Sequence, residues 1–119
     1  MSGIVAIKEN TGYRRVYGRG KSKAAPTLVT YALKTRNDEC RVGITTSKKI
    51  GIAVERNRCR RIIRAAFSSI QNECQGGWDL IFVARFKTKE IKSTDLAVVM
   101  RKQLRDLGVI NQHVEKRPE

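Results

Sequence analysis

The chain has 119 residues, with 25 Lys and Arg against 11 Asp and Glu, so its formal net charge is +14. We expect a single domain over residues 1–119, because that length is enough for one domain and hardly more. A charge of this size opposes compaction unless a polyanion balances it, so nucleic acid is the first candidate partner and an anionic membrane surface the second. No apolar run approaches the roughly 20 residues that a membrane-spanning helix needs, and residues 1–8 lack the apolar stretch of a signal peptide.

The cysteines and the single histidine form no pattern typical of a metal site. Cys40, Cys59 and Cys74 are an odd number without a CxxC pair, and His113 lies in a polar tail. A structural zinc site needs four suitably spaced ligands. We therefore expect no metal site, and scattered free thiols that fit a cytoplasmic location. Cys59 and Cys74 fall on the apolar face of a predicted helix, which favours a role as small hydrophobic residues in the core.

The first predicted element is a helix over residues 10–19. Tyr13, Val16 and Tyr17 recur there at helical spacing, and glycines follow at its end. Residues 19–25 come next and are predicted to be a loose basic stretch.

Two strands are predicted after Pro26. Residues 27–34 are rich in β-branched and aromatic side chains, and residues 41–47 alternate between apolar and small or polar ones. Residues 36–39 have turn composition, so the two runs are predicted to pair as a hairpin. A loop over residues 48–51 follows.

The second half predicts a long helix, a buried strand and a last helix. Apolar residues recur along one stripe of residues 54–73, and residues 78–85 are a continuous apolar run typical of a strand inside a sheet. The last helix begins at Ser93. The order helix, strand, strand, helix, strand, helix predicts an α+β two-layer sandwich, in which helices cover a small sheet. We expect flexible termini over residues 1–8 and 111–119.

Positive charge is concentrated at the start of the long helix. The stretch from Lys48 to Arg64 holds seven basic residues and one acid, Glu55. At about 100° per helical residue, Asn57 and Arg61 point away from the apolar stripe. The basic residues are Lys48, Lys49, Arg56, Arg58, Arg60, Arg61 and Arg64. A charge run is usually a solvated face, but so many guanidinium groups with so little counter-charge favour binding to phosphates, which the planar fork of arginine grips in pairs.

The same stretch contains a specific spacing. It reads Ser47-Lys48-Lys49-Ile50-Gly51, Ala53-Val54, Arg56-Asn57-Arg58, Arg60-Arg61 and Ile63-Arg64. This spacing resembles the signature of the bacterial ribonuclease P protein subunit. The resemblance spans nearly the whole chain, and it includes Tyr13-xx-Val16-Tyr17, Arg41-Val42-Gly43-Ile44 and the run from Trp78 to Arg85.

The resemblance implies roles for these positions. Docking on the catalytic RNA subunit would involve Arg56, Asn57, Arg58, Arg61 and Arg64, with Lys48, Lys49 and Arg60 nearby. A cleft between the first helix and the sheet would hold the single-stranded 5′ leader of precursor tRNA against Tyr13, Tyr17 and Tyr31. Judged by spacing alone, Tyr13 and Tyr17 more often mark core packing.

The resemblance also implies a fold like that of the second domain of ribosomal protein S5. In that fold the second and third strands of the predicted order are joined through the long helix by a left-handed crossover. Handedness rules alone predict a right-handed connection. This feature therefore depends wholly on the resemblance.

The sequence shows no catalytic set. No histidine lies near the basic stretch, and there are no paired carboxylates, nucleophile elbow or P-loop. The resemblance implies that the RNA subunit catalyses removal of the leader to give the mature tRNA 5′ end. Mg²⁺ would then be held mainly by the RNA subunit and the substrate. One protein per RNA would neutralise phosphates and position the leader.

Other classes of function remain open at this point. A ribosomal protein or general RNA chaperone shares the charge and size, but it does not explain the spacing from Ser47 to Arg64. A protein-only nuclease needs clustered carboxylates to hold metal, and the acids here are dispersed. A DNA-binding helix is less favoured, because no helix-turn-helix spacing appears.

Overall fold

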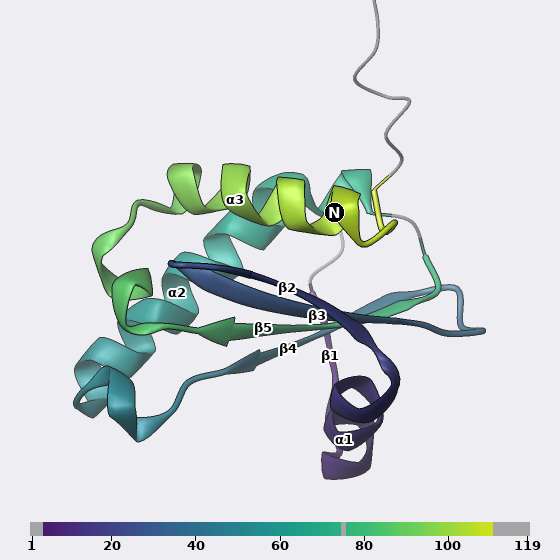
Figure 1. Cartoon of the computed structure of the whole chain (residues 1–119), viewed down its shortest axis with the longest axis horizontal. Helices are drawn as coiled ribbons and strands as arrows, with labels where there is room; N and C mark the ends of the chain where they lie inside the picture. Colours follow the sequence, from purple (N-terminus) through teal and green to yellow (C-terminus); the bar gives the residue numbers. More distant parts are fainter. Residues whose placement is uncertain (1–3, 75, 111–119) are drawn as a thin grey trace, which may run out of the picture.

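The computed structural model describes residues 4–74 and 76–110, and it shows one five-stranded sheet with helices on both faces (Figure 1). The strands are β1 (Val5–Ala6), β2 (Lys21–Ala25), β3 (Leu28–Lys34), β4 (Cys40–Thr45) and β5 (Trp78–Ala84). The α-helices are α1 (Asn10–Arg19), α2 (Ala53–Ile70) and α3 (Ser93–Asp106). Short 3₁₀ turns are η1 (Lys48–Ile50), η2 (Gln71–Glu73) and η3 (Phe86–Glu90). Within the described ranges, no helix combines the length and apolar character needed to cross a membrane.

The apolar strand β5 lies at the centre of the sheet, as its composition predicts. The strand order is β1-β4-β5-β3-β2, with β5 parallel to β4 and antiparallel to β3. Phe82 therefore has Thr30 on one side and Ile44 on the other. Leu80, Ile81 and Phe82 are fully buried, because helices cover the sheet on both faces at this strand.

The predicted hairpin between residues 27–34 and 41–47 is wrong. Both runs are strands, but β5 lies between them and pairs with each along its length. A continuous apolar strand is buried best when it has a neighbour on both edges, and the alternation within β3 and β4 does not specify which strand lies alongside. β3 and β4 follow each other in the chain, but they are therefore not paired in the sheet.

The sheet has two edge strands that the sequence does not predict. The stretch expected to be loose forms β2, whose Lys21 pairs with Ala32 and whose Ala25 pairs with Leu28. Its side chains are mostly exposed, as is common for a lysine-bearing edge strand, so they leave no apolar period.

At the opposite edge, β1 runs parallel to β4, and Val5 lies opposite Arg41. Ile7 is buried. The expectation of a flexible start over residues 1–8 is therefore wrong from Val5 to Ile7, while residues 1–3 and the expected tail over 111–119 lie outside the described residues.

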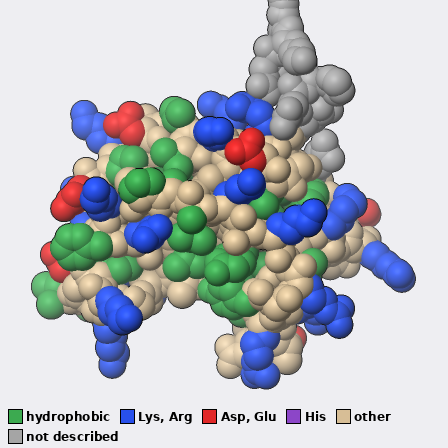
Figure 2. Space-filling view, in the orientation of Figure 1, with side chains coloured by type: hydrophobic (Ala, Val, Ile, Leu, Met, Phe, Trp, Pro, Cys, Tyr) green, Lys and Arg blue, Asp and Glu red, His purple; other side chains and the backbone are tan. Residues whose placement is uncertain are grey.

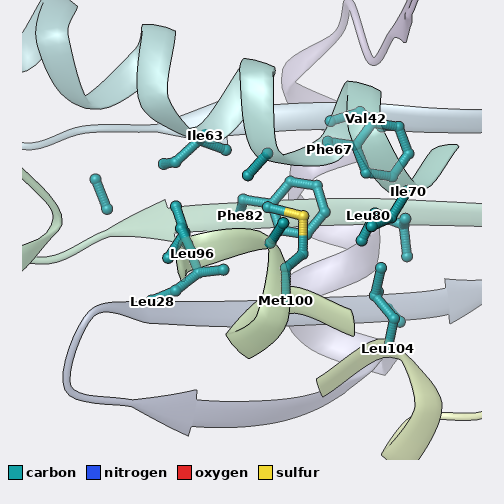
Figure 3. Close-up of a cluster of buried hydrophobic side chains, with 14 of the residues drawn as sticks. Leu28, Val42, Ile63, Phe67, Ile70, Leu80, Phe82, Leu96, Met100 and Leu104 are labelled. Atoms are coloured by element: carbon teal, nitrogen blue, oxygen red, sulfur yellow. The ribbon is translucent and has the colours of Figure 1, made fainter. Parts of the chain in front are cut away.

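The main core lies between the sheet and the helix pair α2 and α3 (Figure 3). The predicted stripe of α2 is confirmed, with Cys59, Ile63 and Phe67 among its buried members. The ring of Phe67 packs on Phe82 of β5 at 5.5 Å between centroids. The α-helix ends at Ile70 rather than at Glu73, because its last turn tightens into the 3₁₀ turn η2. This core fixes the rotation of α2, and with it the residues that the helix exposes.

The connection between β4 and β5 follows the expected path. The two strands are parallel neighbours, and α2 joins them across one face of the sheet (Figure 1). The α+β fold is confirmed: α2 and α3 form one helical layer against the sheet, and α1 lies on the other face over a small cluster of Ile7, Val16 and Ile81. The left-handed sense of the crossover stays a prediction.

The three cysteines are free thiols. Cys59 is fully buried, and burial raises its pKa. Cys74 is half-buried and packs against the main core, as does Cys40. The predicted core position of Cys59 on the helix is thus confirmed. Cys74 also packs on the core, but it lies beyond the end of the helix predicted to carry it.

Candidate nucleic-acid interface

The start of α2 is shaped by one glycine and one acid. Gly51 has a φ of 147°, a conformation that favours glycine, and a Cβ there would collide with the carboxylate of Glu55. That carboxylate accepts a hydrogen bond from the Ile52 N–H at 3.3 Å. A carboxylate in the first turn also suits the helix dipole. These contacts explain why a glycine and an acid lie between Lys49 and Arg56, within the basic stretch.

Lys89 of η3 neutralises this acid. Its ammonium lies 3.3 Å from the Glu55 carboxylate and donates to the Ile50 carbonyl at 3.0 Å. The Lys89 carbonyl in turn accepts a hydrogen bond from Arg58 Nε at 3.1 Å. The one acid of the basic stretch is therefore held by a distant lysine, and the neighbouring arginines remain available.

The outer face of α2 carries the predicted guanidinium groups. Asn57, Arg61 and Arg64 are exposed, which confirms that they point away from the apolar stripe. Within residues 4–74 and 76–110, none of the five arginines from 56 to 64 forms an ion pair with a carboxylate. Arg60 instead donates to the Asn57 amide oxygen at 3.0 Å, which ties two predicted site residues together.

Lys48 and Lys49 extend this face beyond the helix. Both are exposed on η1, a 3₁₀ turn where the sequence predicts a loop. All eight predicted residues thus belong to η1 and to the part of α2 that ends at Arg64. We call this set the basic face. Its residues are Lys48, Lys49, Arg56, Asn57, Arg58, Arg60, Arg61 and Arg64.

Hollows border the basic face on two sides. One of about 530 Å³ lies toward the start of α3, with Arg58 and Arg61 among its lining residues. Another of about 220 Å³ lies toward β1 and β4, and there Arg60 and Arg64 share the lining with Tyr13. The second hollow joins the basic face to the side of the sheet that carries α1.

The three predicted tyrosines gather on that side of the sheet. Tyr13 packs its ring on Gly43 of β4, where an added Cβ would come within 2.6 Å of the phenolic oxygen. Tyr17 and Tyr31 meet edge to face, with ring centroids 4.8 Å apart and planes at 86°. The Tyr17 hydroxyl shares a hydrogen bond with Thr45 Oγ1 at 3.1 Å. Tyr13 is therefore largely a packing residue, whereas Tyr17 remains 40% exposed.

An uncovered part of the sheet continues from these rings. Helix α1 covers only one end of its face of the sheet (Figure 1). Beyond it, Val29, Val83 and Thr45 lie in register across β3, β5 and β4, and each is half-buried. The tyrosines thus border a mildly apolar floor. We call Tyr13, Tyr17, Tyr31 and this floor the tyrosine surface.

Sequence reasoning missed the contribution of η3. Lys89 fixes the start of α2, and Arg85, Phe86 and Lys87 lie exposed on the same segment. The signal was present as a short run of cations around an aromatic residue, but it follows directly on the apolar strand and reads as its end. Figure 2 shows Lys and Arg side chains over the whole visible face, with far fewer Asp and Glu.

The described residues offer no metal site. Nowhere in the ranges 4–74 and 76–110 do three His, Cys, Asp or Glu side chains gather closely enough to hold a metal ion. His113 lies outside those ranges.

Fold and surface together define a class: small basic α+β proteins that present a row of exposed cations on a helix beside aromatic side chains. Residues 1–108 match the family model of Ribonuclease P. The chain therefore belongs to the ribonuclease P protein family.

Individual relatives agree. The ribonuclease P protein component of Clostridioides difficile (strain 630) is 42% identical over 91 residues, which is 76% of this chain and 80% of the relative. That of Thermoanaerobacter sp. (strain X514) is 41% identical over 99 residues, covering 83% of this chain and 85% of the relative. The enzyme to which the chain belongs is the ribonuclease P holoenzyme, with the protein as an accessory subunit that partners its RNA.

Solved structures show the same fold. The ribonuclease P protein of Staphylococcus aureus superposes with a TM-score of 0.78 at 32% identity, covering 89% of this chain and 97% of that one. The protein from Thermotoga maritima gives a TM-score of 0.74 at 22% identity, over 84% of this chain and 96% of that one, and shows likeness of fold alone.

Proposed function

We propose that the basic face binds the phosphate backbone of the catalytic RNA subunit, and that the tyrosine surface contacts the single-stranded 5′ leader of precursor tRNA. One protein would serve one RNA, in the cytoplasm. The observation that carries the proposal is the row of arginines without carboxylate partners. Because no described carboxylate forms an ion pair with these arginines, a dense polyanion is the partner that such a row fits.

The basic face suits a backbone contact more than base reading. Exposed guanidinium groups such as Arg61 and Arg64 can each grip two phosphate oxygens. Lys48 and Lys49 add mobile point charges beside them. The hydrogen bond between Arg60 and Asn57 holds one of these forks in place before RNA arrives. Preorganised cations of this kind position an RNA helix without demanding a sequence.

The tyrosine surface suits a strand of variable sequence. A base stacked on an aromatic ring contributes roughly 1–3 kcal/mol whatever its identity. Tyr17 offers an exposed ring held by Thr45 and Tyr31, and Val29 and Val83 extend an apolar floor beside it. Arg60 and Arg64 line the same hollow as Tyr13, which supports a leader path that runs from the tyrosine surface toward the basic face.

The chain itself supplies no cleavage chemistry in the proposal. The Mg²⁺ that the reaction uses would be held by the RNA subunit and the substrate, because the described residues gather no carboxylates to hold it. The protein would lower the repulsion between crowded phosphates and position the leader.

The division of labour is tested by cleavage of precursor tRNA with protein alone, RNA subunit alone and both together. We expect no cleavage by the protein alone, and a rate at low Mg²⁺ that rises with added protein until one protein is present per RNA. Cleavage by the protein without RNA would overturn the proposal. Continued increase beyond equal stoichiometry would contradict the one-to-one assembly.

The leader contact is tested by Tyr17→Ala in the assembled holoenzyme. We expect binding of precursor tRNA to weaken by about 1 kcal/mol or more, and binding of mature tRNA, which has no leader, to stay the same. Tyr17→Phe is the matched control, because it removes only the hydrogen bond to Thr45 and keeps the ring. Equal weakening toward precursor and mature tRNA would exclude Tyr17 from the leader contact.

A further inference from the structure

The turn η3 displays a largely exposed aromatic ring, which the ammonium of Lys89 contacts. Phe86 is 58% exposed at the end of the buried strand β5. It borders a surface hollow of about 600 Å³. The lining residues are Ala24, Ala25, Pro26, Arg85, Phe86 and Lys87. The hollow therefore has a small apolar floor, an aromatic wall and two cations, with no acid among the lining residues.

The position of Phe86 in the chain is fixed by hydrogen bonds of the neighbouring residues Arg85 and Thr88. Thr88 is fully buried, and its hydroxyl donates to the Thr27 carbonyl at 2.6 Å and accepts from the Arg85 N–H at 2.8 Å. The Arg85 guanidinium donates to the Ala25 carbonyl at 3.1 Å. These bonds hold the turn against the tip of the β2–β3 hairpin, so the ring is presented to solvent by the fold.

One cation contacts the ring, and two more flank it in the chain. The Lys89 ammonium lies 4.0 Å from its centroid, while Lys87 and Arg85 are exposed on either side in the chain. A single exposed phenylalanine is ordinary on a protein surface. An exposed ring fixed between cations beside a small hollow is instead the arrangement that binds a nucleotide, whose base stacks while its phosphates meet the cations.

The turn is continuous with the basic face. Lys89 contacts Glu55 and Ile50, and its carbonyl accepts the hydrogen bond from Arg58. Phe86 thus lies at the end of the molecule where α2 begins, the end that also carries η1 with Lys48 and Lys49. An RNA bound along the basic face is the polyanion that reaches this turn.

We propose that Phe86, with Arg85 and Lys87, forms a stacking subsite for an unpaired nucleotide of the RNA subunit. The subsite rests on the proposed binding of that RNA by the basic face, and extends it with a contact that is apolar rather than ionic. The difference in chemistry separates the two contacts experimentally, because stacking on a neutral ring releases no counterions.

The test measures affinity for the RNA subunit over a range of salt concentrations, with full-length protein. Phe86→Ala should weaken binding by roughly 5- to 150-fold, the loss expected for one stacked base. The slope of log affinity against log salt should stay that of the unchanged protein. Phe86→Trp should keep the affinity, and the indole at position 86 should be quenched when RNA binds. Val98→Ala, at another exposed apolar side chain on α3, is the matched control and should change nothing.

Several results would overturn the subsite. One is an unchanged affinity of Phe86→Ala for the RNA subunit. A second is a loss confined to precursor tRNA binding by the preassembled holoenzyme, which would assign the ring to the substrate instead. A third is an indole at position 86 that RNA does not quench, and this readout decides the matter even if Phe86→Ala unfolds more easily. If the unchanged protein fails to bind the RNA subunit at all, the proposed function fails first, so the two failures are distinguishable.

Discussion

Arginines occupy two contrasting settings in this molecule. Arg41 of β4 donates from Nε and Nη2 to the two carboxylate oxygens of Asp79 at 2.9 and 2.7 Å, and Asp79 is fully buried. The hydrogen bonds to Asp79 are the main cause of the raised pKa of the Arg41 guanidinium. On α2, by contrast, Arg61 and Arg64 face solvent, and no described carboxylate pairs with them.

The difference separates a structural guanidinium from a binding one. Both kinds carry the same charge, and the side chain itself does not reveal its role. Arg41 satisfies a buried carboxylate in the sheet, so its charge is used within the fold. Arg61 and Arg64 contribute no comparable internal bond, so their charge is available to a partner. Breaking the first kind should cost stability, and removing the second kind should cost RNA affinity.

The largest effect is expected for Asp79→Asn, which leaves Arg41 without its carboxylate. We expect the free energy of unfolding to fall by about 2 kcal/mol, which is less than for a fully buried pair because the Arg41 side chain that remains is 29% exposed. Urea denaturation measures it. Asp95→Asn, at an exposed carboxylate in the first turn of α3, is the control and should cost less than about 1 kcal/mol. Equal losses for the two variants would show that the pair of Arg41 and Asp79 stabilises the fold no more than an exposed carboxylate does.

The next effect concerns Arg61→Gln and Arg64→Gln. Each should reduce the slope of log RNA-subunit affinity against log salt by roughly 0.7 to 0.9, because each removes one phosphate contact. The free energy of unfolding should stay within about 0.5 kcal/mol of the unchanged protein, as for other exposed positions. Lys102→Gln on α3, an exposed cation already paired with Asp106, should leave the slope unchanged. Unchanged slopes for both arginine variants would remove them from the interface.

A smaller effect is expected from Cys59, which lies on the inner side of the same helix. Burial raises the pKa of this thiol, so the folded protein keeps the proton at pH values where the unfolded chain loses it. The stabilisation that comes from burying the neutral thiol is fully present below the pKa of the unfolded chain, near 8.5. It is lost as the pH rises from there toward the folded pKa. The free energy of unfolding of the unchanged protein should therefore fall by about 1 kcal/mol per pH unit more than that of Cys59→Ala in this alkaline window.

The matching measurement is urea denaturation of both proteins at several pH values from 7 upward. The constant cost of the cavity in Cys59→Ala cancels, because only the change with pH is compared. If the free energy of unfolding changed equally with pH in the two proteins, burial on the inner side of α2 would not raise the pKa of the Cys59 thiol.

The smallest effect is expected for the pair of Arg101 and Glu73, in which the arginine is paired but half-exposed. The bond is bidentate, with distances of 3.0 and 2.9 Å, but the side chains are 36% and 34% exposed. Solvent screening limits such pairs, so a double-mutant cycle with Arg101→Gln and Glu73→Gln should give a coupling of about 0.5 kcal/mol. A coupling near the loss in Asp79→Asn would show that pairing alone, and not burial, makes an arginine structural.

The rotation of α2 was predictable, because the recurrence of Ile63 and Phe67 along one stripe is a local property of the chain. The outward position of Arg61 and Arg64 follows from that stripe by helical geometry. The central place of β5 was predictable for a similar reason, since a continuous apolar strand must be covered on both faces.

Strand pairing was not predictable in the same way. Alternation in β3 and β4 indicates strands, but it carries no record of which neighbour each will have. The edge strand β2 gains its order from backbone hydrogen bonds to β3, and its exposed side chains contain no trace of them. The different roles of two tyrosines were not predictable either. Tyr13 packs on Gly43 while Tyr17 stays open, although both lie on one predicted helical face.

The sequence by itself determined the helices, the buried strand and the concentration of cations around Arg56–Arg64, because period and charge are written in neighbouring residues. Only the tertiary structure decided which cations were left for a partner. Lys89 holds Glu55 from η3, and Asp79 holds Arg41 across 38 positions of the chain. Whether a charge is compensated depends on groups that folding brings within a few ångströms, and distance along the chain does not reveal those groups.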